Sequence, residues 1–284
     1  GSAVLVTLTT VSETKSHGGV QGVYSHASTT CNCEMTFAVF VPPQAATEKC
    51  PVLWYLSGLT CSHQNVMDKG EYRQISAQKG IIIVCPDTSP RGDEVPDEPD
   101  NWQFGKGAGF YLNATEAPFS THYNMYDYVV NELPGIIESN FNADLSRQSI
   151  TGHSMGGHGA LTIALKNPDR FKSCSAFAPI CRPSLAGWSA PAFEKYLGEK
   201  SETWRRYDAC DLIADGHRFS PILCDQGDKD EWMEDGCRPQ ALVDATKGTD
   251  IDLTSRIQEG YDHLYLFVST FMPEHIAWHA KHLK

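Results

Sequence analysis

The segment 147–168 constrains this chain most, because its centre at 152–156 reads G-H-S-M-G and fits the pattern G-x-S-x-G. That pattern is typical of a sharp turn from a strand into a helix, which holds the serine clear of the sheet. An apolar lead precedes the turn, and a helix-forming run at 160–165 follows it until Pro168 ends the helix. A glycine-rich turn with a capping serine is the simpler alternative, but the flanking strand and helix favour an activated Ser154.

Two continuous apolar runs, at 52–56 and 81–85, predict strands that are covered on both faces. The polar run 64–79 between them predicts one surface helix closed by Gly80, which makes a βαβ unit. Residues 4–41 are predicted to be β-structure, because the stretches 4–10 and 34–41 alternate between apolar and polar side chains, which is typical of antiparallel strands with one wet face. The sequence therefore predicts an α/β fold, with a mainly parallel central sheet, helices on both faces and antiparallel N-terminal strands.

No linker or repeat divides the sequence, so we expect a single domain over 1–284, with Gly1-Ser2 set aside as a tag-cleavage scar. Residues 86–122 are rich in Pro, Gly and Asp and are longer than a simple connection between two elements needs to be. They are therefore expected to pack as a functional loop. Residues 182–217 are expected to form a helical excursion within the domain. The other predicted elements are helices at 123–141 and 273–284 and strands at 175–179, 221–225 and 253–258.

The formal net charge of −12 disfavours nucleic acid or an anionic membrane as a partner, because both attract a basic surface. No apolar run approaches the ~20 residues that a membrane helix needs, and we expect no secretory leader. The ten cysteines are scattered without a C-x-x-C pair, so neither a disulfide framework nor a zinc ribbon is predicted. These features favour a reducing, cytoplasmic location.

A serine hydroxyl needs a base to become a nucleophile at neutral pH, and the base needs an orienting acid. In this kind of turn the acid and then the base follow the serine, each in a loop after a strand. Among eleven histidines, His263 is the one in the loop directly after the last predicted strand. Several acidic residues follow the strand that ends at Asp225. We take Asp230 as the acid, because a turn opened by Gly227 lets it point back over the sheet edge, and Asp228 is the alternative.

The remaining histidines near these motifs have simpler interpretations. His153 and His158 belong to the turn itself, where packing is the preferred role. His275, His279 and His282 share one helix and their spacing would suit a divalent ion, but without an H-E-x-x-H motif a polar terminal helix is preferred.

A developing negative charge on a substrate oxygen needs two backbone N–H donors beside the serine. One should come from Met155, directly after Ser154. The other should come from Leu59, in the loop after the first apolar strand, because Gly58 lets that backbone turn in close. Cys61 follows, and it is expected either to pack as a buried thiol or to line the pocket.

With these residues assigned, the sequence resembles the S-formylglutathione hydrolases, the esterase D family of α/β-hydrolases. The resemblance spans nearly the whole chain. Its specific segments are S-G-L-T-C at 57–61, D-T-S-P-R-G at 87–92, G-x-G-A-G-F-Y at 105–111, Y-N-M-Y-D-Y at 123–128, G-H-S-M-G-G-H-G-A-L at 152–161, F-A-P-I-C at 177–181, D-Q-G at 225–227 and Q-E-G-Y-D-H at 258–263.

The resemblance implies an α/β-hydrolase fold and the hydrolysis of S-formylglutathione to glutathione and formate, without a metal or a cofactor. Members of the family are commonly homodimers, so the same is expected here. Carried over by motif, the family's functional residues are the triad Ser154, Asp230 and His263, the oxyanion donors Leu59 and Met155, and the site cysteine Cys61. We also expect Trp188 to line the substrate pocket beside Cys61.

The sequence departs from the family pattern at three places. Ser62-His63 replaces the usual Thr-Glu, Arg182 replaces Asn, and Ala-Gly at 186–187 replaces Cys-Pro. An acidic chain that binds an anionic thioester needs a local basic group. Arg91, Lys106 and Arg182 are the candidates.

Two alternatives remain. A broad carboxylesterase would act on short acyl esters with the same residues, and the ratio of kcat/KM for S-formylglutathione to that for a nitrophenyl ester would distinguish it. A non-catalytic scaffold is disfavoured because serine, acid and base are all present, and labelling of Ser154 by a fluorophosphonate would exclude it.

Overall fold

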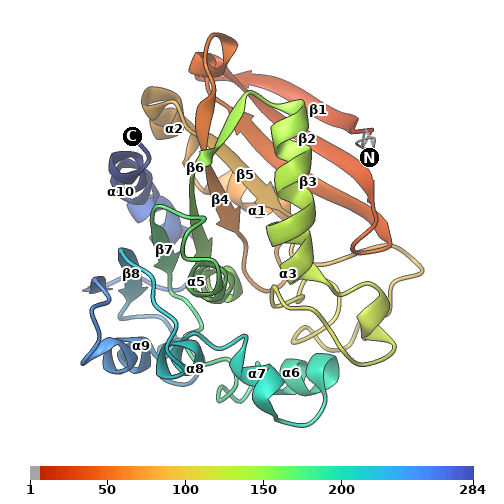
Figure 1. The fold of residues 1–284 in the computed structure, drawn as a ribbon, viewed down its shortest axis with the longest axis vertical. Coiled ribbons are helices and arrows are strands. Elements are labelled where there is room, and N and C mark those ends of the chain that lie inside the picture. The colour runs from red at the N-terminus through yellow and green to blue at the C-terminus, as the bar shows by residue number, and fades with distance from the viewer. Residues whose placement is uncertain (1–6) are drawn as a thin grey trace.

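A nine-stranded sheet runs through residues 7–284, the part of the chain that the computed structural model describes (Figure 1). The expectation for Gly1-Ser2 lies outside these residues. The strand order is β1-β2-β3-β5-β4-β6-β7-β8-β9, antiparallel from β1 through the β3–β5 pair and parallel from β5 onward. The predicted sheet is therefore confirmed. The strands are β1 (Thr9–Ser16), β2 (Gly19–Ser28), β3 (Cys33–Val41), β4 (Cys50–Leu56), β5 (Ile82–Pro86), β6 (Ala143–His153), β7 (Cys174–Phe177), β8 (Ile222–Gly227) and β9 (Leu253–Gln258).

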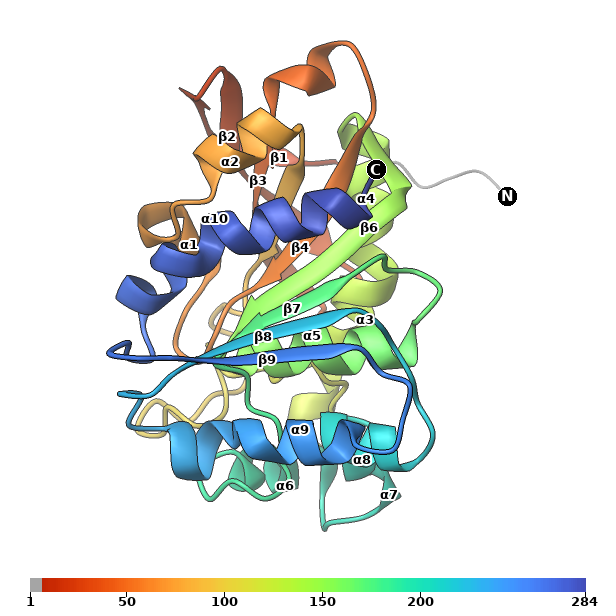
Figure 2. The ribbon, with the colours of Figure 1, turned by 90° about the vertical axis from the view of Figure 1, so that its left-hand side faces the viewer.

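Helices cover both faces of the sheet, as predicted (Figure 2). One face carries α4 (Leu133–Asn140) and α5 (Met155–Lys166), with α8 (Ala209–Ala214) packed against α5, and α9 (Pro239–Thr246) packed against α8 and β9. The other face carries α1 (His63–Lys69), α2 (Arg73–Lys79) and α10 (Tyr265–His282). The remaining helical segments are η1 (Pro43–Ala46), η2 (Phe119–Thr121), α3 (Met125–Asp127), η3 (Tyr128–Glu132), α6 (Ala190–Leu197), α7 (Glu202–Arg205) and η4 (Met233–Cys237).

Strand β4 shows why its sequence is continuously apolar. Successive side chains of a strand point to opposite faces. Val52, Trp54 and Leu56 accordingly belong to the core under α4 and α5. Leu53 and Tyr55 belong to the second core, under α1, α2 and α10. Every residue of β4 is buried, because helices cover the sheet on both sides.

Several helices differ from the sequence-based prediction. The single helix expected at 64–79 is two helices, because the chain turns sharply after Gly70 and Glu71 adopts a φ of 54°. The closing helix begins at Tyr265 rather than at Pro273, which lies inside it. Phe267 on the added turns packs into the core, and such burial outweighs the hydrogen bond that a proline removes. The sequence did not predict α9.

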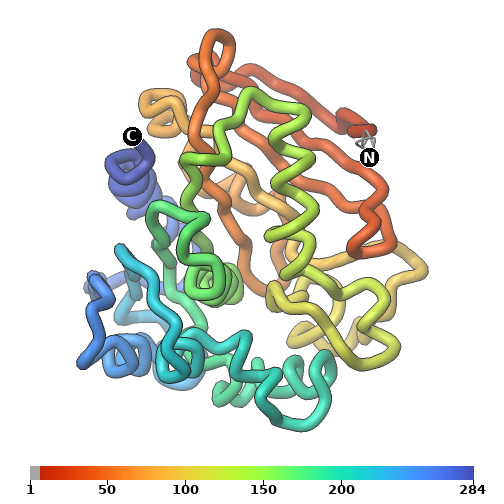
Figure 3. The backbone as a smooth tube through the Cα atoms, in the orientation of Figure 1, coloured from red at the N-terminus to blue at the C-terminus, as the bar shows by residue number. Residues whose placement is uncertain are grey.

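The long connections pack as expected. The segment 86–122 has one short helical turn but buries Phe110, Tyr111 and Leu112 completely, and Figure 3 traces it in yellow beneath the helix of 123–141. That helix is continuous through α3, η3 and α4, with one turn of π geometry. The excursion 182–217 consists of the short helices α6, α7 and α8, as predicted.

A buried chain of hydrogen bonds fastens α10 to the sheet. The Asp225 carboxylate accepts from His275 Nε2 at 2.6 Å, and His275 Nδ1 lies 2.9 Å from the Ser175 hydroxyl. His279 Nε2 lies 2.8 Å from the same hydroxyl, and its Nδ1 lies 2.7 Å from Ser173 Oγ. Two of the three histidines considered for a divalent ion are thus buried and already hydrogen-bonded, which agrees with a structural role for them.

Buried neutral histidines make the stability of this fold sensitive to acid. Burial lowers the pKa of His153 to about 3 and that of His158 to about 4, so the folded chain keeps both rings neutral where the unfolded chain protonates them. Between pH 6 and pH 5 these two histidines alone should lower the free energy of unfolding by about 2 kcal/mol, and the buried rings of His26, His275 and His279, whose pKa burial also lowers, add to the fall. Carboxylates with a lowered pKa, such as Asp225, change the free energy of unfolding only below about pH 4, so they do not contribute to this fall.

Urea unfolding at the two pH values, followed by tryptophan fluorescence, measures this drop. The variant His158→Gln should lose about 1 kcal/mol less than the parent chain, because its amide does not titrate and can still donate to the Phe110 carbonyl. An unfolding midpoint that is the same at pH 6 and pH 5 would contradict the prediction.

Candidate active site

Ser154 lies in a turn between β6 and α5 that only glycine-flanked sequences can form. The serine has φ 58° and ψ −114°, which aligns its side chain away from the sheet at the N-terminus of α5. A Cβ on Gly152 would lie 2.1 Å from the carbonyl oxygen of Gly156. A Cβ on Gly156 would lie 1.8 Å from the carbonyl oxygen of Leu56 in β4. Both glycines of G-x-S-x-G are therefore required by contact with neighbouring backbone.

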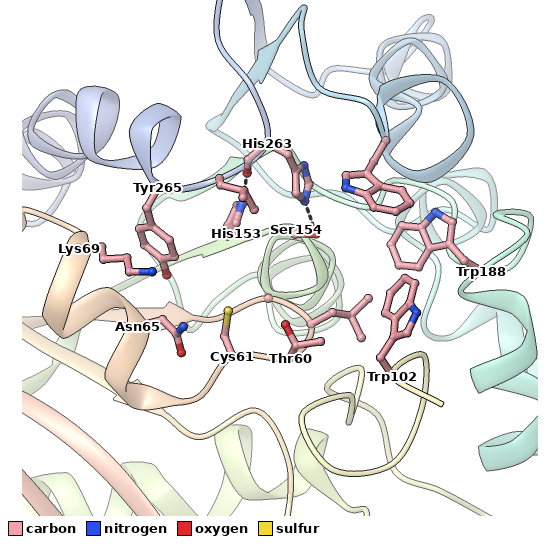
Figure 4. A pocket seen from close by; sticks show the side chains of 14 residues that line it. Thr60, Cys61, Asn65, Lys69, Trp102, His153, Ser154, Trp188, His263 and Tyr265 are labelled. Atoms are coloured by element: carbon pink, nitrogen blue, oxygen red, sulfur yellow. Dashed lines mark hydrogen bonds between the residues drawn. The ribbon is translucent and has the colours of Figure 1, made fainter. Parts of the chain in front are cut away.

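The structure brings Ser154, His263 and Asp230 together in one hydrogen-bonded row. His263 Nε2 lies 2.9 Å from Ser154 Oγ, and His263 Nδ1 lies 2.5 Å from Asp230 Oδ2 (Figure 4 shows the first contact). Asp230 follows β8 and His263 follows β9, while the serine follows β6. Parallel strands end at the same edge of a sheet, so three loops that are distant in sequence meet there.

Asp230 is held as an acceptor from three directions. Its Oδ1 accepts from the Trp232 N–H at 2.7 Å, and its Oδ2 accepts from Gln226 Nε2 at 2.9 Å as well as from His263. Burial alone would raise the pKa of Asp230, but the hydrogen bond and charge of His263, with the other donors, lower it below its usual value. The carboxyl is thus held ionised against the imidazole.

The neighbouring carboxylates are engaged elsewhere. Asp228, the alternative acid, accepts from the Gly260 N–H at 2.8 Å and so holds the turn that precedes His263. Asp225 is fully buried and accepts from Arg256 at 2.7 and 2.9 Å, besides His275. Among the residues described, Asp230 is the carboxylate that reaches the His263 ring.

His153 supports the back of the His263 loop. Its Nε2 lies 2.6 Å from the His263 carbonyl oxygen, so the ring carries its proton on that nitrogen and donates. Burial, and then the neighbouring charge of His263, lowers the pKa of His153 to about 3, which keeps the ring neutral. The packing role expected from the sequence is thus a specific hydrogen bond that orients the backbone of His263.

Two backbone N–H groups next to Ser154 are available to a substrate oxygen. Within residues 7–284 neither the Leu59 N–H nor the Met155 N–H donates to a protein acceptor. The neighbouring amides of Thr60 and Cys61 do donate, to backbone carbonyls at 2.9 and 3.2 Å. A Cβ at Gly58 would lie 3.2 Å from the serine Cβ, so this loop passes directly beside the serine. These are the two amides that the sequence suggests as oxyanion donors, and that role stays a prediction.

A cavity of about 430 Å³ opens above Ser154 and has an aromatic side. The rings of Trp102, Trp188 and Trp232 contact one another with centroids 6.0, 6.1 and 6.2 Å apart. Trp188 and Cys61 line the cavity, as expected. Trp102 and Trp232 were not predicted to line it, although each is a large aromatic residue in a loop that follows a strand.

The opposite side of the cavity is polar. Lys69, Asn65 and Tyr265 line it, across the serine from the tryptophans (Figure 4). Lys69 is exposed at the end of α1 and forms no ion pair with the described part of the chain. Lys69 lies at the cavity because α1 ends there, whereas the sequence predicted one longer helix over 64–79.

The three cations suggested from the sequence do not line the cavity. Arg91 pairs with Asp87 at 2.7 Å, and Arg182 pairs with Asp208 and Asp211 at 3.1 and 2.9 Å. Lys106, which follows a tight glycine turn, also lies outside it. Sequence position does not show that carboxylates already neutralise Arg91 and Arg182, nor that the loop of Lys106 lies away from the cavity.

Comparison with known proteins agrees with this geometry. Residues 28–278 match the Esterase family. The chain is 49% identical over 276 residues to the S-formylglutathione hydrolase of Mus musculus, covering 96% of this chain and 98% of the relative. The chain belongs to the esterase family. Esterase family members that it resembles also include the S-formylglutathione hydrolase of Paracoccus denitrificans (strain Pd 1222), at 48% identity over 274 residues and with the same coverage.

Solved structures of other esterases support the fold. The S-formylglutathione hydrolase of Agrobacterium tumefaciens superimposes with a TM-score of 0.96 at 62% identity, over 97% of this chain and 99% of that chain. The predicted α/β-hydrolase fold is confirmed. None of the helices in residues 7–284 combines the length and the apolar character that crossing a bilayer requires.

The row of hydrogen bonds predicts unequal effects of two similar substitutions. Asp230→Asn should lower kcat by about 10⁴-fold, because an amide favours the wrong imidazole tautomer. Asp228→Asn is the matched control and should stay within a few-fold of the parent, because its amide oxygen can still accept from the Gly260 N–H. Steady-state hydrolysis of a nitrophenyl ester measures both, and equal losses would contradict the assignment of the acid.

Proposed function

We propose that this chain hydrolyses S-formylglutathione to glutathione and formate through a formyl-serine intermediate. The observation that carries the proposal is the hydrogen-bonded row Ser154–His263–Asp230 at the floor of an open cavity. Further support comes from relatives named for this activity, which are about half identical to the chain over nearly its full length.

In the first half of the reaction, Ser154 Oγ attacks the formyl carbon while His263 Nε2 takes its proton. The negative charge that develops on the formyl oxygen is stabilised by the N–H groups of Leu59 and Met155. Asp230 holds the imidazole in the tautomer that accepts at Nε2 and stabilises its protonated form. The thioester bond then breaks, and glutathione leaves as a thiolate that receives the proton from His263.

In the second half, a water molecule replaces the departed thiol. His263 takes a proton from this water as its oxygen attacks the formyl-serine carbon, and the same two amides stabilise the new oxyanion. Collapse of this intermediate releases formate and returns the proton to Ser154. No further group is needed for either half.

The two sides of the cavity suggest how a thiol with carboxylates is oriented. Lys69 offers a positive charge that is free of a protein carboxylate within the described residues, so it suits a carboxylate of glutathione. The tryptophan side offers apolar surface instead. On this proposal glutathione extends toward Lys69, and the small formyl group occupies the space next to Ser154.

Removal of the serine hydroxyl tests the reaction class. Ser154→Ala should lower kcat for S-formylglutathione by about a millionfold, as loss of the nucleophile does in subtilisin. A fluorophosphonate should label the parent chain and leave this variant unlabelled. Residual turnover within a hundredfold of the parent would exclude the formyl-serine.

Removal of the Lys69 charge tests the orientation. Lys69→Met should lower kcat/KM for S-formylglutathione by up to about fivefold, since an exposed ion pair contributes roughly 0.2–1 kcal/mol. It should leave kcat/KM for nitrophenyl acetate, which is neutral, unchanged. Lys106→Met removes a cation outside the cavity and is the matched control. An equal loss for both substrates would contradict a role in binding the anion.

A broad carboxylesterase acting on short acyl esters is the second candidate. It is favoured by the tryptophan side of the cavity, which offers more apolar surface than a formyl group needs and lies across the serine from Lys69 (Figure 4). The ratio of kcat/KM for S-formylglutathione to that for nitrophenyl acetate decides between the two, and a ratio near or below one would favour the carboxylesterase.

We further propose a homodimer in the cytoplasm. The dimer is supported by the family resemblance, and sedimentation velocity would measure it directly. The location is supported by the cysteines, all ten of which are free thiols and none of which is paired in residues 7–284. Fractionation of cells that produce the protein tests the location.

A further inference from the structure

A buried cysteine lies against the acid and the base. Cys237 ends η4, is fully buried, and places its Sγ 3.7 Å from Asp230 Oδ2 and 4.0 Å from His263 Nδ1. These three atoms lie within 4.8 Å of one another. The reaction proposed above does not use the thiol, which lies on the Nδ1 side of the His263 ring and also approaches the Ala178 carbonyl oxygen at 3.5 Å.

The three side chains form a typical zinc ligand set. Thiolate, imidazole and carboxylate bind Zn²⁺ at about 2.3, 2.0 and 2.1 Å, which puts ligand atoms roughly 3.5 Å apart in a tetrahedral site. The two distances from the sulfur, 3.7 and 4.0 Å, are already close to that spacing. Only the contact between Asp230 and His263, now 2.5 Å, has to open by about 1 Å.

We propose that Asp230, Cys237 and His263 form an inhibitory site for Zn²⁺. The ion binds Oδ2, Sγ and Nδ1 in place of the protons that now lie between them. The imidazole proton moves from Nδ1 to Nε2, and the thiol proton is released to solvent, so no electrons are transferred. With a proton on Nε2, His263 cannot accept the proton of Ser154, and the enzyme is inactive until the ion leaves.

Access to the site is through His263. Its side chain is 11% exposed at the cavity, whereas the carboxylate and the thiol beneath it are buried. Cys61 is a thiol that lines the cavity itself, in the loop after β4, so it provides a built-in comparison. The proposal rests on His263 being the base, and binding of the ion can be measured without that assumption.

The test is a titration of the purified chain with zinc chloride, with nitrophenyl acetate as the substrate because the glutathione thiol would itself bind zinc. We expect inhibition that a chelator such as EDTA reverses. In Cys237→Ala and Cys237→Ser the zinc concentration for half-inhibition, relative to each variant's own rate, should rise at least about tenfold, since even outer-shell partners contribute ~10–100-fold to affinity. Cys61→Ser should keep the sensitivity of the parent.

Direct binding separates this proposal from the proposed reaction. Equilibrium dialysis should show one inhibitory Zn²⁺ per parent chain and its loss in both Cys237 variants, whichever ester the enzyme prefers. Cobalt(II) should give a thiolate-to-metal absorption band that the Cys237 variants lack and Cys61→Ser retains. Unchanged zinc sensitivity in both Cys237 variants, or loss of the ion in Cys61→Ser, would overturn the site.

Discussion

The close approach of α5 to the end of β4 is the constraint on which the site depends. A single additional carbon on Gly156 would meet the Leu56 carbonyl oxygen at 1.8 Å, so the helix can begin there only without a side chain. The same approach puts the loop after β4 beside Ser154, where the N–H groups of Leu59 and Met155 have no protein acceptor within residues 7–284. The serine, the two free amides and the N-terminus of α5 therefore lie together because of one backbone contact.

The loops that carry Asp230 and His263 depend on a second group of contacts, between β8, β9 and α10. Asp225 in β8 accepts from Arg256 and Gln258 of the adjacent β9, and from His275 of α10. This carboxylate therefore connects two strands and a helix just before the loops that carry Asp230 and His263. Because these hydrogen bonds to Asp225 are buried, they hold the starts of both loops rigidly, although the tips of the loops are partly exposed.

The surroundings of the imidazole show how differently three buried polar contacts act. His153 donates to the backbone of His263 and orients it, whereas Asp230 accepts from its ring and sets its tautomer. Cys237 adds a thiol at 3.7 Å from the same carboxylate, too long to rival the imidazole but suited to a metal ion. A site built for proton transfer thus contains the ligands that would block it.

The amino-acid sequence by itself determined the fold class and identified Ser154 and His263 as a candidate pair. It also determined the order in which the serine, the acid and the base follow their strands along the chain. It could do so because local patterns carry this information: continuous apolar runs require cover on both faces, and G-x-S-x-G requires a crowded turn. The choice of Asp230 over Asp228 also came from the sequence, through the turn at Gly227, but several carboxylates competed for it.

Only the tertiary structure decided which side chains share the cavity. Trp102 and Trp232 meet Trp188 from loops far apart in the chain, and Lys69 enters because its helix ends early. Arg91 and Arg182, which the sequence suggested, are neutralised by carboxylates. A local pattern records the conformation of its own segment, whereas charge pairing and cavity lining depend on distances between segments, and those distances exist only once the sheet has brought its loops to one edge.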